Sequence, residues 1–331
     1  EDIHSRVRQQ GLLHKDVALG NSLVDMYAKC GIFEKAREVF EQIPAQDVVA
    51  WTALISGYAQ HGLYDEAIQC FQQMQDEGIR PDAITFICAL KACGRIGASH
   101  EGQEIHSEIM KQGLLKRNII VGNALVDMYA KCGNIAKAQL VFDELPNKDV
   151  VSWNSLMKGY AQYGNGEEAV KCFEQMQRNG VTPTLVTFIC VLNACSQIGA
   201  ANKGREIHGE VERRGLSGRD LVGNTLINMY IKCGSADKAQ DVFDKLPFRN
   251  VVSWTTVIAG YVTCGHAEKA LYCYENMQLE GVSPDAITFI FGFQACNGIE
   301  SIDKGQEIRN QLVKKGGWSL KLKLLMAIPM D

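Results

Sequence analysis

The chain has 331 residues, of which 46% are hydrophobic and 22% charged, and this composition excludes a disordered protein. The formal net charge of −4 excludes a protein whose affinity for nucleic acid rests mainly on a strongly basic surface. No apolar run reaches the ~18 residues that a membrane-spanning helix needs, so no membrane partner is expected.

The first residues, Glu1 to Arg6, have neither the basic start and apolar stretch of a signal peptide nor the Arg- and Ser-rich composition of a transit peptide. Because the chain does not begin with methionine, we expect it to be a fragment of a longer protein.

The sequence repeats itself with a period of about a hundred residues. The segment 20–31, GNSLVDMYAKCG, returns with small changes at 122–133 and 223–234, and a Val-Val-x-Trp sequence recurs with the same spacing. Each period contains three shorter units, and each unit has the apolar spacing of two amphipathic helices separated by a glycine. One such hairpin cannot bury its apolar face alone, so the sequence predicts an all-α solenoid of stacked hairpins.

The unit lengths, the Val-Val-x-Trp starts, the Asp-Met-Tyr-Ala-Lys-Cys-Gly segments and the Gly-x-x-Pro ends resemble the pentatricopeptide repeat family, and more narrowly its plant PLS subclass. The resemblance implies a right-handed α-solenoid superhelix of stacked helix-turn-helix repeats. It divides the chain into L-type repeats (partial 1–16, then 83–118, 185–219 and 286–320), S-type repeats (17–47, 119–149 and 220–250), P-type repeats (48–82, 150–184 and 251–285) and an atypical tail (321–331).

The resemblance also implies a function. Repeats of this family read single-stranded RNA, one base per repeat, and proteins of the PLS subclass act in RNA editing or mRNA processing in the mitochondrion or chloroplast. The fifth and the last residue of a repeat face one base. The expected base-reading pairs are Asn21 with Asp47, Thr52 with Asp82, Asn123 with Asp149, Asn154 with Thr184, Asn224 with Asn250, and Thr255 with Asp285.

Hydrogen-bond chemistry suggests which base each pair prefers. A carboxylate only accepts hydrogen bonds and suits the imino N–H of guanine or uracil, whereas an amide can donate to the bare ring nitrogen of adenine or cytosine. A short Thr at the fifth position leaves room for a purine, and the longer Asn favours a pyrimidine. The predicted RNA is 5′-U-G-n-U-Y-n-Y-G-n-3′, where Y is a pyrimidine and n is any base.

Each Asn or Thr of these pairs has an alternative role as a helix N-cap, which such residues often fill. Little base readout is expected from the L-type repeats, because isoleucine cannot hydrogen-bond a base edge. Their fifth and last residues are Ile87 with Asn118, Ile189 with Arg219, and Ile290 with Leu320.

Two further groups of residues are expected at the RNA. The resemblance places the second residue of each repeat against the base faces, with packing at a helix start as the alternative role: Ala18, Val49, Ile84, Ile120, Val151, Val186, Leu221, Val252 and Ile287. Lys29, Lys131 and Lys232 lie about two helical turns after a base-reading Asn. These lysines either contact phosphates or remain solvated near a helix C-terminus.

No catalytic, metal-binding or cofactor motif is found, so no enzyme activity and no cofactor are predicted. His106-Ser107-Glu108 and His208-Gly209-Glu210 resemble the start of the zinc deaminase signature but lack the later Pro-Cys-x-x-Cys, so we assign them to the repeat. Six cysteines recur with the repeat and are expected to be buried core residues: Cys30, Cys132, Cys233, Cys93, Cys195 and Cys296.

Proteins of the PLS subclass commonly end in a cytidine deaminase domain, but here the tail 321–331 replaces the expected next repeat. An editing role therefore needs a separate deaminase or another editing or processing protein as a partner. The competing hypothesis is a protein- or peptide-binding scaffold, because helical-repeat surfaces hold peptides and the chain is nearly neutral. The recurring base-reading pairs favour RNA over a peptide.

Overall fold

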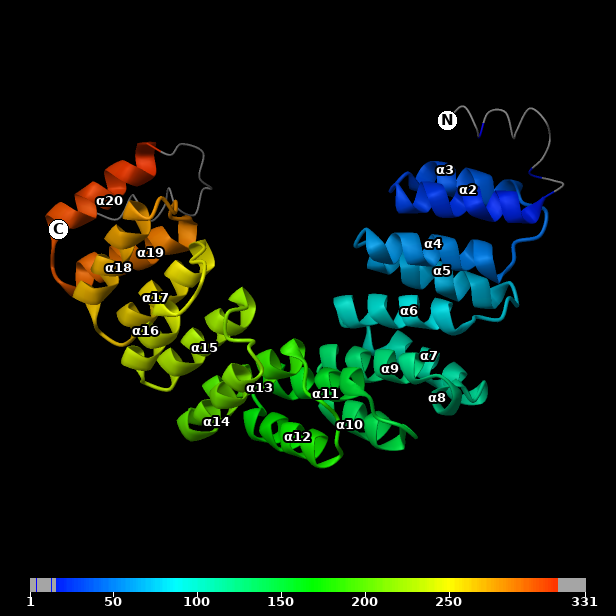
Figure 1. The fold of residues 1–331 in the computed structure, drawn as a ribbon. Coiled ribbons are helices and arrows are strands. Elements are labelled where there is room, and N and C mark those ends of the chain that lie inside the picture. The colour runs from blue at the N-terminus through cyan, green and yellow to red at the C-terminus, as the bar shows by residue number, and fades with distance from the viewer. Residues whose placement is uncertain (1–3, 5–12, 14–15, 315–331) are drawn as a thin grey trace. The chain divides into compact units, whose positions relative to one another are not determined.

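The computed structural model describes residues 4, 13 and 16–314, and every regular element in these ranges is a helix (Figure 1). The predicted all-α solenoid is confirmed, because successive helices pair into hairpins that pack on their neighbours. Most of the predicted partial repeat 1–16 and the whole tail 321–331 lie outside the described residues. No helix within the described ranges is both long enough and apolar enough to cross a bilayer.

The chain divides into two compact units, residues 1–163 and 164–331, and this division falls inside the predicted repeat 150–184. The first unit contains α2 (Val17–Lys29), α3 (Phe33–Gln42), α4 (Val48–Gln60), α5 (Tyr64–Asp76), α6 (Ala83–Ile96), α7 (Ser99–Lys111), α8 (Leu114–Arg117), α9 (Ile119–Lys131), α10 (Ile135–Glu144) and α11 (Val150–Gln162). The second contains α12 (Gly166–Arg178), α13 (Leu185–Gln197), α14 (Ala201–Arg213), α15 (Asp220–Lys232), α16 (Ala236–Asp244), α17 (Val251–Thr263), α18 (Ala267–Leu279), α19 (Ala286–Gly298) and α20 (Ile302–Lys314).

Within each unit, the first helices of successive repeats contact one another and form one layer. In the first unit this layer runs α2, α4, α6, α9 and α11, and in the second it runs α13, α15, α17 and α19. The second helix of a hairpin packs against its own first helix and against the next one, as α5 does with α4 and α6. The layer of first helices contains the fifth and second residues of the predicted repeats, so it positions the candidate site.

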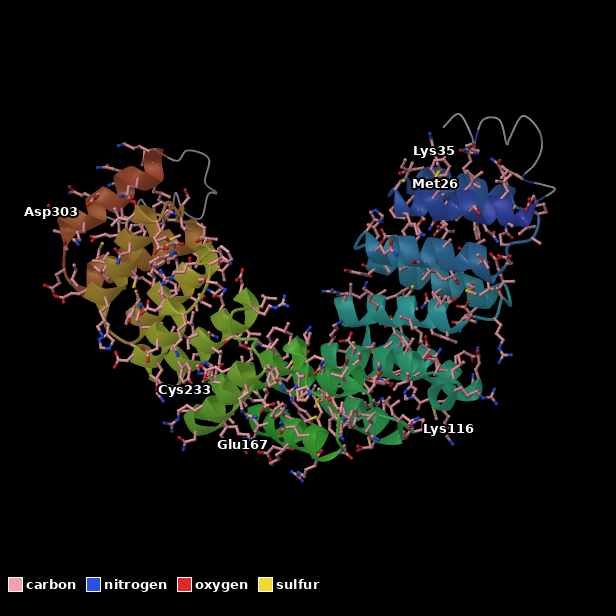
Figure 2. The ribbon with its side chains drawn as sticks, viewed as in Figure 1. Met26, Lys35, Lys116, Glu167, Cys233 and Asp303 are labelled. Carbon is pink, nitrogen blue, oxygen red and sulfur yellow. The ribbon has the colours of Figure 1, made fainter. Side chains whose placement is uncertain are left out.

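Local chemistry sets the helix boundaries. Helix α4 begins after Asp47, whose carboxylate accepts hydrogen bonds from two backbone N–H groups of the first turn. It ends before Gly62, whose φ of 81° favours glycine. Glu167 and Asp303, both labelled in Figure 2, lie in the first turns of α12 and α20, where a negative charge complements the helix dipole.

The core lies between the first and second helices of the hairpins. Trp51 is 1% exposed, and its ring meets Phe40 edge-on at a centroid distance of 4.7 Å. The same contact recurs as Phe142–Trp153 and Phe243–Trp254. At Gly57 the backbone of α4 approaches α2 so closely that a Cβ would lie 2.5 Å from Cβ of Ala28. This glycine therefore sets the spacing between two first helices of the layer.

The prediction that all six repeat-equivalent cysteines are buried is wrong for three of them. Cys30 is exposed, and Cys132 and Cys233 are half-buried. Each is the C-cap of a first helix, where the chain leaves the core; Cys233 is labelled at the end of α15 in Figure 2. The buried three, which lie inside first helices, are Cys93, Cys195 and Cys296.

The two His-x-Glu sequences belong to the packing between repeats. Nδ1 of His106 lies 2.9 Å from the hydroxyl of Tyr129, and Nδ1 of His208 lies 2.9 Å from the hydroxyl of Tyr230. Burial lowers the pKa of both histidines, so both favour the neutral form. No cluster of His, Cys, Asp or Glu suited to a metal ion occurs among the residues that the structure describes.

Candidate nucleic-acid interface

Two of the predicted base-reading pairs are joined directly. Nδ2 of Asn21 donates to both carboxylate oxygens of Asp47, at 3.0 and 3.1 Å. Nδ2 of Asn123 donates to Oδ1 of Asp149 at 3.1 Å. Both asparagines are only 7% exposed. The structure therefore brings the fifth and last residues of repeats 17–47 and 119–149 together and fixes the orientation of each amide.

Two other pairs are joined through a third side chain. The hydroxyls of Thr52 and Thr85 lie 2.6 Å apart, and Oγ1 of Thr85 donates to Oδ1 of Asp82 at 2.8 Å. The same chain of contacts links Thr255 through Thr288 to Asp285, at 2.6 and 2.7 Å. The sequence reasoning missed these linking threonines. Their signal was a hydroxyl residue three positions after each Asp, the spacing of a capping box.

The residue three positions after the Asp, which is Thr85 in the pair above, also distinguishes Asn123 from Asn21. Oγ of Ser152 donates to Oδ1 of Asn123 at 2.6 Å, so the amide oxygen of this asparagine has a donor. Ala50 occupies the equivalent position beside Asn21 and offers no hydroxyl. Oδ1 of Asn21 is accordingly buried without a hydrogen-bond partner among the described residues.

Asn224 and Asn250 are not joined to each other. Oδ1 of Asn250 accepts hydrogen bonds from the backbone of Val252 and Ser253, at 2.9 and 3.0 Å, and its Nδ2 lies 3.4 Å from Oδ2 of Asp220. Oδ1 of Asn224 is buried and has no hydrogen-bond partner within the part of the chain that the structure describes. Among Asn21, Asn123 and Asn224, the side chain of Asn224 is therefore the least constrained.

The remaining predicted pair, Asn154 with Thr184, has one residue in each compact unit. The two residues are therefore described separately. Asn154 lies half-buried in α11. Thr184 is the N-cap of α13, and its hydroxyl lies 3.2 Å from the hydroxyl of Thr187.

In every predicted pair, only the last residue of the repeat has the N-cap role. Each last residue caps the next first helix: Asp47 (α4), Asp82 (α6), Asp149 (α11), Thr184 (α13), Asn250 (α17) and Asp285 (α19). The fifth residues lie inside the helices and are not caps. At Asp82 the cap uses only Oδ1, and Oδ2 has no hydrogen-bond partner among the described residues. One carboxylate can therefore cap a helix and still accept a further hydrogen bond.

The carboxylate of Asp149 is held in its charged form. Burial raises its pKa, but hydrogen bonds from the backbone and hydroxyl of Ser152, from Asn123 and from the backbone of Val151 outweigh this effect. The pKa of Asp149 therefore lies below the usual value for an aspartate, and the group acts only as an acceptor at neutral pH.

The predicted second residues are exposed aliphatic side chains on the first helices of each unit. All nine are exposed, and the eight larger ones range from 51% for Val151 to 70% for Leu221. This exposure does not fit the alternative role of packing at a helix start. In the predicted L-type repeats Ile87, Ile189 and Ile290 are half-buried, Asn118 caps α9, Arg219 precedes α15, and Leu320 lies outside the described residues.

A groove of about 720 Å³ in the second unit gathers residues from three of these predicted groups. The first helices α15, α17 and α19 contribute to its walls. Its lining includes the predicted base-reading residues Asn224, Thr255 and Asp285, the exposed aliphatic residues Val252 and Ile287, and Lys232.

The three predicted phosphate-binding lysines differ in their neighbours. Lys29 forms an ion pair with Asp25 at 2.7 Å, and Lys131 forms one with Asp127. Asn228 occupies the equivalent position before Lys232, and no ion pair of Lys232 occurs among the described residues. Its ammonium group is the least neutralised of the three.

Stacked helical hairpins, with polar pairs and exposed aliphatic residues that recur on the first helices, define a helical-repeat protein. Two family models match this chain. The PPR repeat family matches residues 46–95, 148–197 and 249–297, and the PPR repeat matches residues 21–48, 123–150 and 224–251. Together these matches cover more than half of the sequence, and the chain belongs to the PPR repeat family.

Curated relatives agree with this assignment. A mitochondrial pentatricopeptide repeat-containing protein of Arabidopsis thaliana is 33% identical over 303 residues, which are 92% of this chain and 54% of that protein. A chloroplastic one from the same plant is 38% identical over 313 residues, 94% of this chain and 58% of that protein. The chain therefore spans about half the length of these relatives.

Solved structures share the fold. The crystal structure of the pentatricopeptide repeat protein PPR10 in complex with an 18-nt psaJ RNA element matches with a TM-score of 0.75 at 19% identity, over 93% of this chain and 46% of that one. PPR10 from maize matches with a TM-score of 0.69 at 21% identity, over 97% of this chain and 52% of that one. At these identities the likeness is one of fold.

Proposed function

We propose that this chain binds single-stranded RNA in a sequence-specific manner, at one base per P- or S-type repeat, and carries out no catalysis itself. The observation that carries the proposal is the coupling of fifth and last residues, direct in Asn21–Asp47 and through Thr85 in Thr52–Asp82. Packing alone gives no reason for polar groups to recur in this arrangement beside exposed aliphatic residues.

The proposed mode of binding uses two kinds of contact. An unstacked base lies between the aliphatic second residues of neighbouring repeats, such as Val49 and Ile84, which contact its two faces without choosing among bases. The edge of the base meets the base-reading pair, where Oδ2 of Asp82 accepts from the imino N–H of guanine. A net charge of −4 supports an affinity that depends more on bases than on phosphates.

We further propose that the chain is the recognition part of an organellar RNA editing or processing factor of the PLS subclass. The PLS pattern of unit lengths and the mitochondrial and chloroplastic relatives support this role. A crystallised relative of the same fold holds an RNA element, which supports RNA as the ligand. A separate deaminase or processing protein then supplies the chemistry.

Selection of bound RNAs from a random single-stranded pool tests the proposal. We expect enrichment of 5′-U-G-n-U-Y-n-Y-G-n-3′ and a large loss of affinity when the same sequence is offered as a duplex, because a duplex hides the base edges. A pool that yields no common sequence, or a duplex bound as tightly as the single strand, would contradict the proposal.

A further inference from the structure

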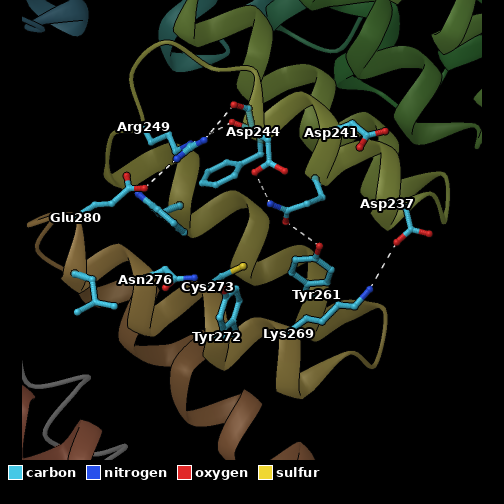
Figure 3. A pocket seen from close by; sticks show the side chains of 14 residues that line it. Asp237, Asp241, Asp244, Arg249, Tyr261, Lys269, Tyr272, Cys273, Asn276 and Glu280 are labelled. Atoms are coloured by element: carbon cyan, nitrogen blue, oxygen red, sulfur yellow. Dashed lines mark hydrogen bonds and ion pairs between the residues drawn. The ribbon is translucent and has the colours of Figure 1, made fainter.

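A second groove, of about 600 Å³, lies in the second unit between α16 and α18 (Figure 3). We call it the α16–α18 groove. Its lining includes the buried side chains of Phe243, Trp254 and Tyr261, and none of the predicted RNA-contacting residues lines it. The candidate RNA interface therefore does not account for this surface.

Large apolar side chains are exposed at this groove. Tyr272 and Leu279 both line it and are 66% and 84% exposed. They lie two turns apart on α18 and so share one face of the helix. Phe248, which precedes the lining residue Arg249 in the chain but does not itself line the groove, is 77% exposed. Exposed apolar residues gathered in this way are typical of an interaction site.

The internal repeat provides a comparison for each of these residues. The positions equivalent to Tyr272 carry Gln69 and Lys171 in the two earlier repeats, and those equivalent to Leu279 carry Asp76 and Arg178. Phe248 likewise replaces Ala45 and Asn147. The same hairpin thus folds with polar or small residues at all three positions. The apolar residues of the last repeat are not required by the repeat fold.

The charge of the groove indicates what fits it. Four carboxylates line it, from Asp237, Asp241, Asp244 and Glu280. The two basic residues of the lining are already paired, Arg249 with Glu280 at 2.9 Å and Lys269 with Asp237 at 3.6 Å (Figure 3).

The remaining carboxylates leave the groove acidic. Asp244 accepts from Gln240, and Asp241 is exposed and has no ion pair among the described residues. This excess of negative charge opposes an RNA backbone and complements a lysine or arginine.

We propose that the α16–α18 groove binds a short segment of a partner protein in which a lysine or arginine adjoins a large apolar side chain. The apolar side chain packs against Tyr272 and Leu279, and the basic group lies beside Asp241. This surface is separate from the base-reading pairs, so RNA and the partner bind at the same time.

Selection of a random 12-residue peptide library against the 331-residue chain tests this proposal. Enriched peptides are expected to combine a basic and a large apolar residue. The variant Tyr272→Lys/Leu279→Arg, which installs the residues of the preceding repeat, should weaken a synthetic copy of an enriched peptide at least tenfold. Asp241→Asn should weaken it less and reduce the salt dependence of binding.

RNA binding and thermal unfolding of the double variant serve as controls, and both are expected to match the wild type. Failure to enrich any peptide, or peptides that bind the double variant as well as the wild type, would overturn the proposal. A wild-type chain that dimerises through this surface, with dimerisation lost in the double variant, would identify a second copy as the occupant and also overturn it. Loss of RNA binding in the variant would assign the groove to RNA.

Discussion

The hydroxyl of Thr85 lies 2.6 Å from the hydroxyl of Thr52 and donates to the carboxylate of Asp82 at 2.8 Å. Thr85 belongs to the next repeat and is completely buried. The two residues of this proposed base-reading pair are thus held by one buried side chain. The geometry of this proposed pair therefore depends on a residue of the neighbouring repeat.

Replacing Thr85 with valine tests this dependence. Valine keeps the shape but leaves the hydroxyl of Thr52 without its partner, so the free energy of unfolding is expected to fall by ~1–3 kcal/mol. Discrimination at the base read by Thr52 and Asp82 should weaken, with other bases unaffected. Urea unfolding and RNA competition measure the two effects. Unchanged discrimination in a destabilised variant would show that Thr85 is only structural.

Positions 50 and 152 are equivalent in the repeat. Installing at each the residue found at the other tests the side-chain contacts of Asn21 and Asn123. Ser152→Ala removes the donor to Oδ1 of Asn123 and should lower the free energy of unfolding by ~1–3 kcal/mol. Ala50→Ser supplies a donor to the unpartnered Oδ1 of Asn21 and should raise it by ~0.5–1.5 kcal/mol. Changes of the same sign in both variants would contradict this account of the two pairs.

The sequence predicted the helical solenoid because the apolar spacing and the glycines that end helices recur about every hundred residues. Each recurrence supports the same assignment of helices. It did not predict that the last residues are N-caps while the fifth residues are not, since Asn, Asp and Thr suit both roles. It also missed Thr85 and Ser152, because a hydroxyl at the third position of a helix looks like an ordinary capping box. Only the stacking of repeats shows that these hydroxyls reach the preceding repeat.

The error at Cys30 has a related cause. Recurrence in the sequence predicts burial only when it reflects the core, and a residue also recurs where it ends a helix, as Cys30 does. Periodicity identifies equivalent positions without telling which of them face the core.

Lys232 is expected to contribute more to RNA affinity than Lys29. Lys29 is already paired with Asp25, whereas Lys232 lines the groove beside Asn224 without an ion pair among the described residues. Lys232→Ala should reduce the slope of log affinity against log salt by about 1, and Lys29→Ala should change it less. Binding titrations at several salt concentrations measure both slopes. Equal slopes for the two variants would argue against a phosphate contact at Lys232.

Stability is expected to fall on mild acidification. Burial lowers the pKa of His106 and His208 in the folded state, so the unfolded chain binds more protons as the pH falls below the ordinary histidine pKa. The stabilisation is complete above about pH 6.5 and is lost as the pH falls through the lowered pKa. Urea unfolding at about pH 7.5 and about pH 5.5 should show this loss. The double variant His106→Gln/His208→Gln should show a smaller loss, and an unchanged one would assign the effect to other groups.

The most direct measurement of the central claim is an RNA competition with Asp82→Asn. Asparagine also caps at this position, as Asn250 does in its repeat, so the helix should be retained. RNAs that differ only at the second base should shift in preference from G toward A, with a loss for G of ~1–3 kcal/mol, because the amide replaces an acceptor with a donor. The matched variant Asp285→Asn should shift only the eighth base. If G stays equally preferred in Asp82→Asn, or if the shift appears at another base, the base-reading pairs are not those assigned here.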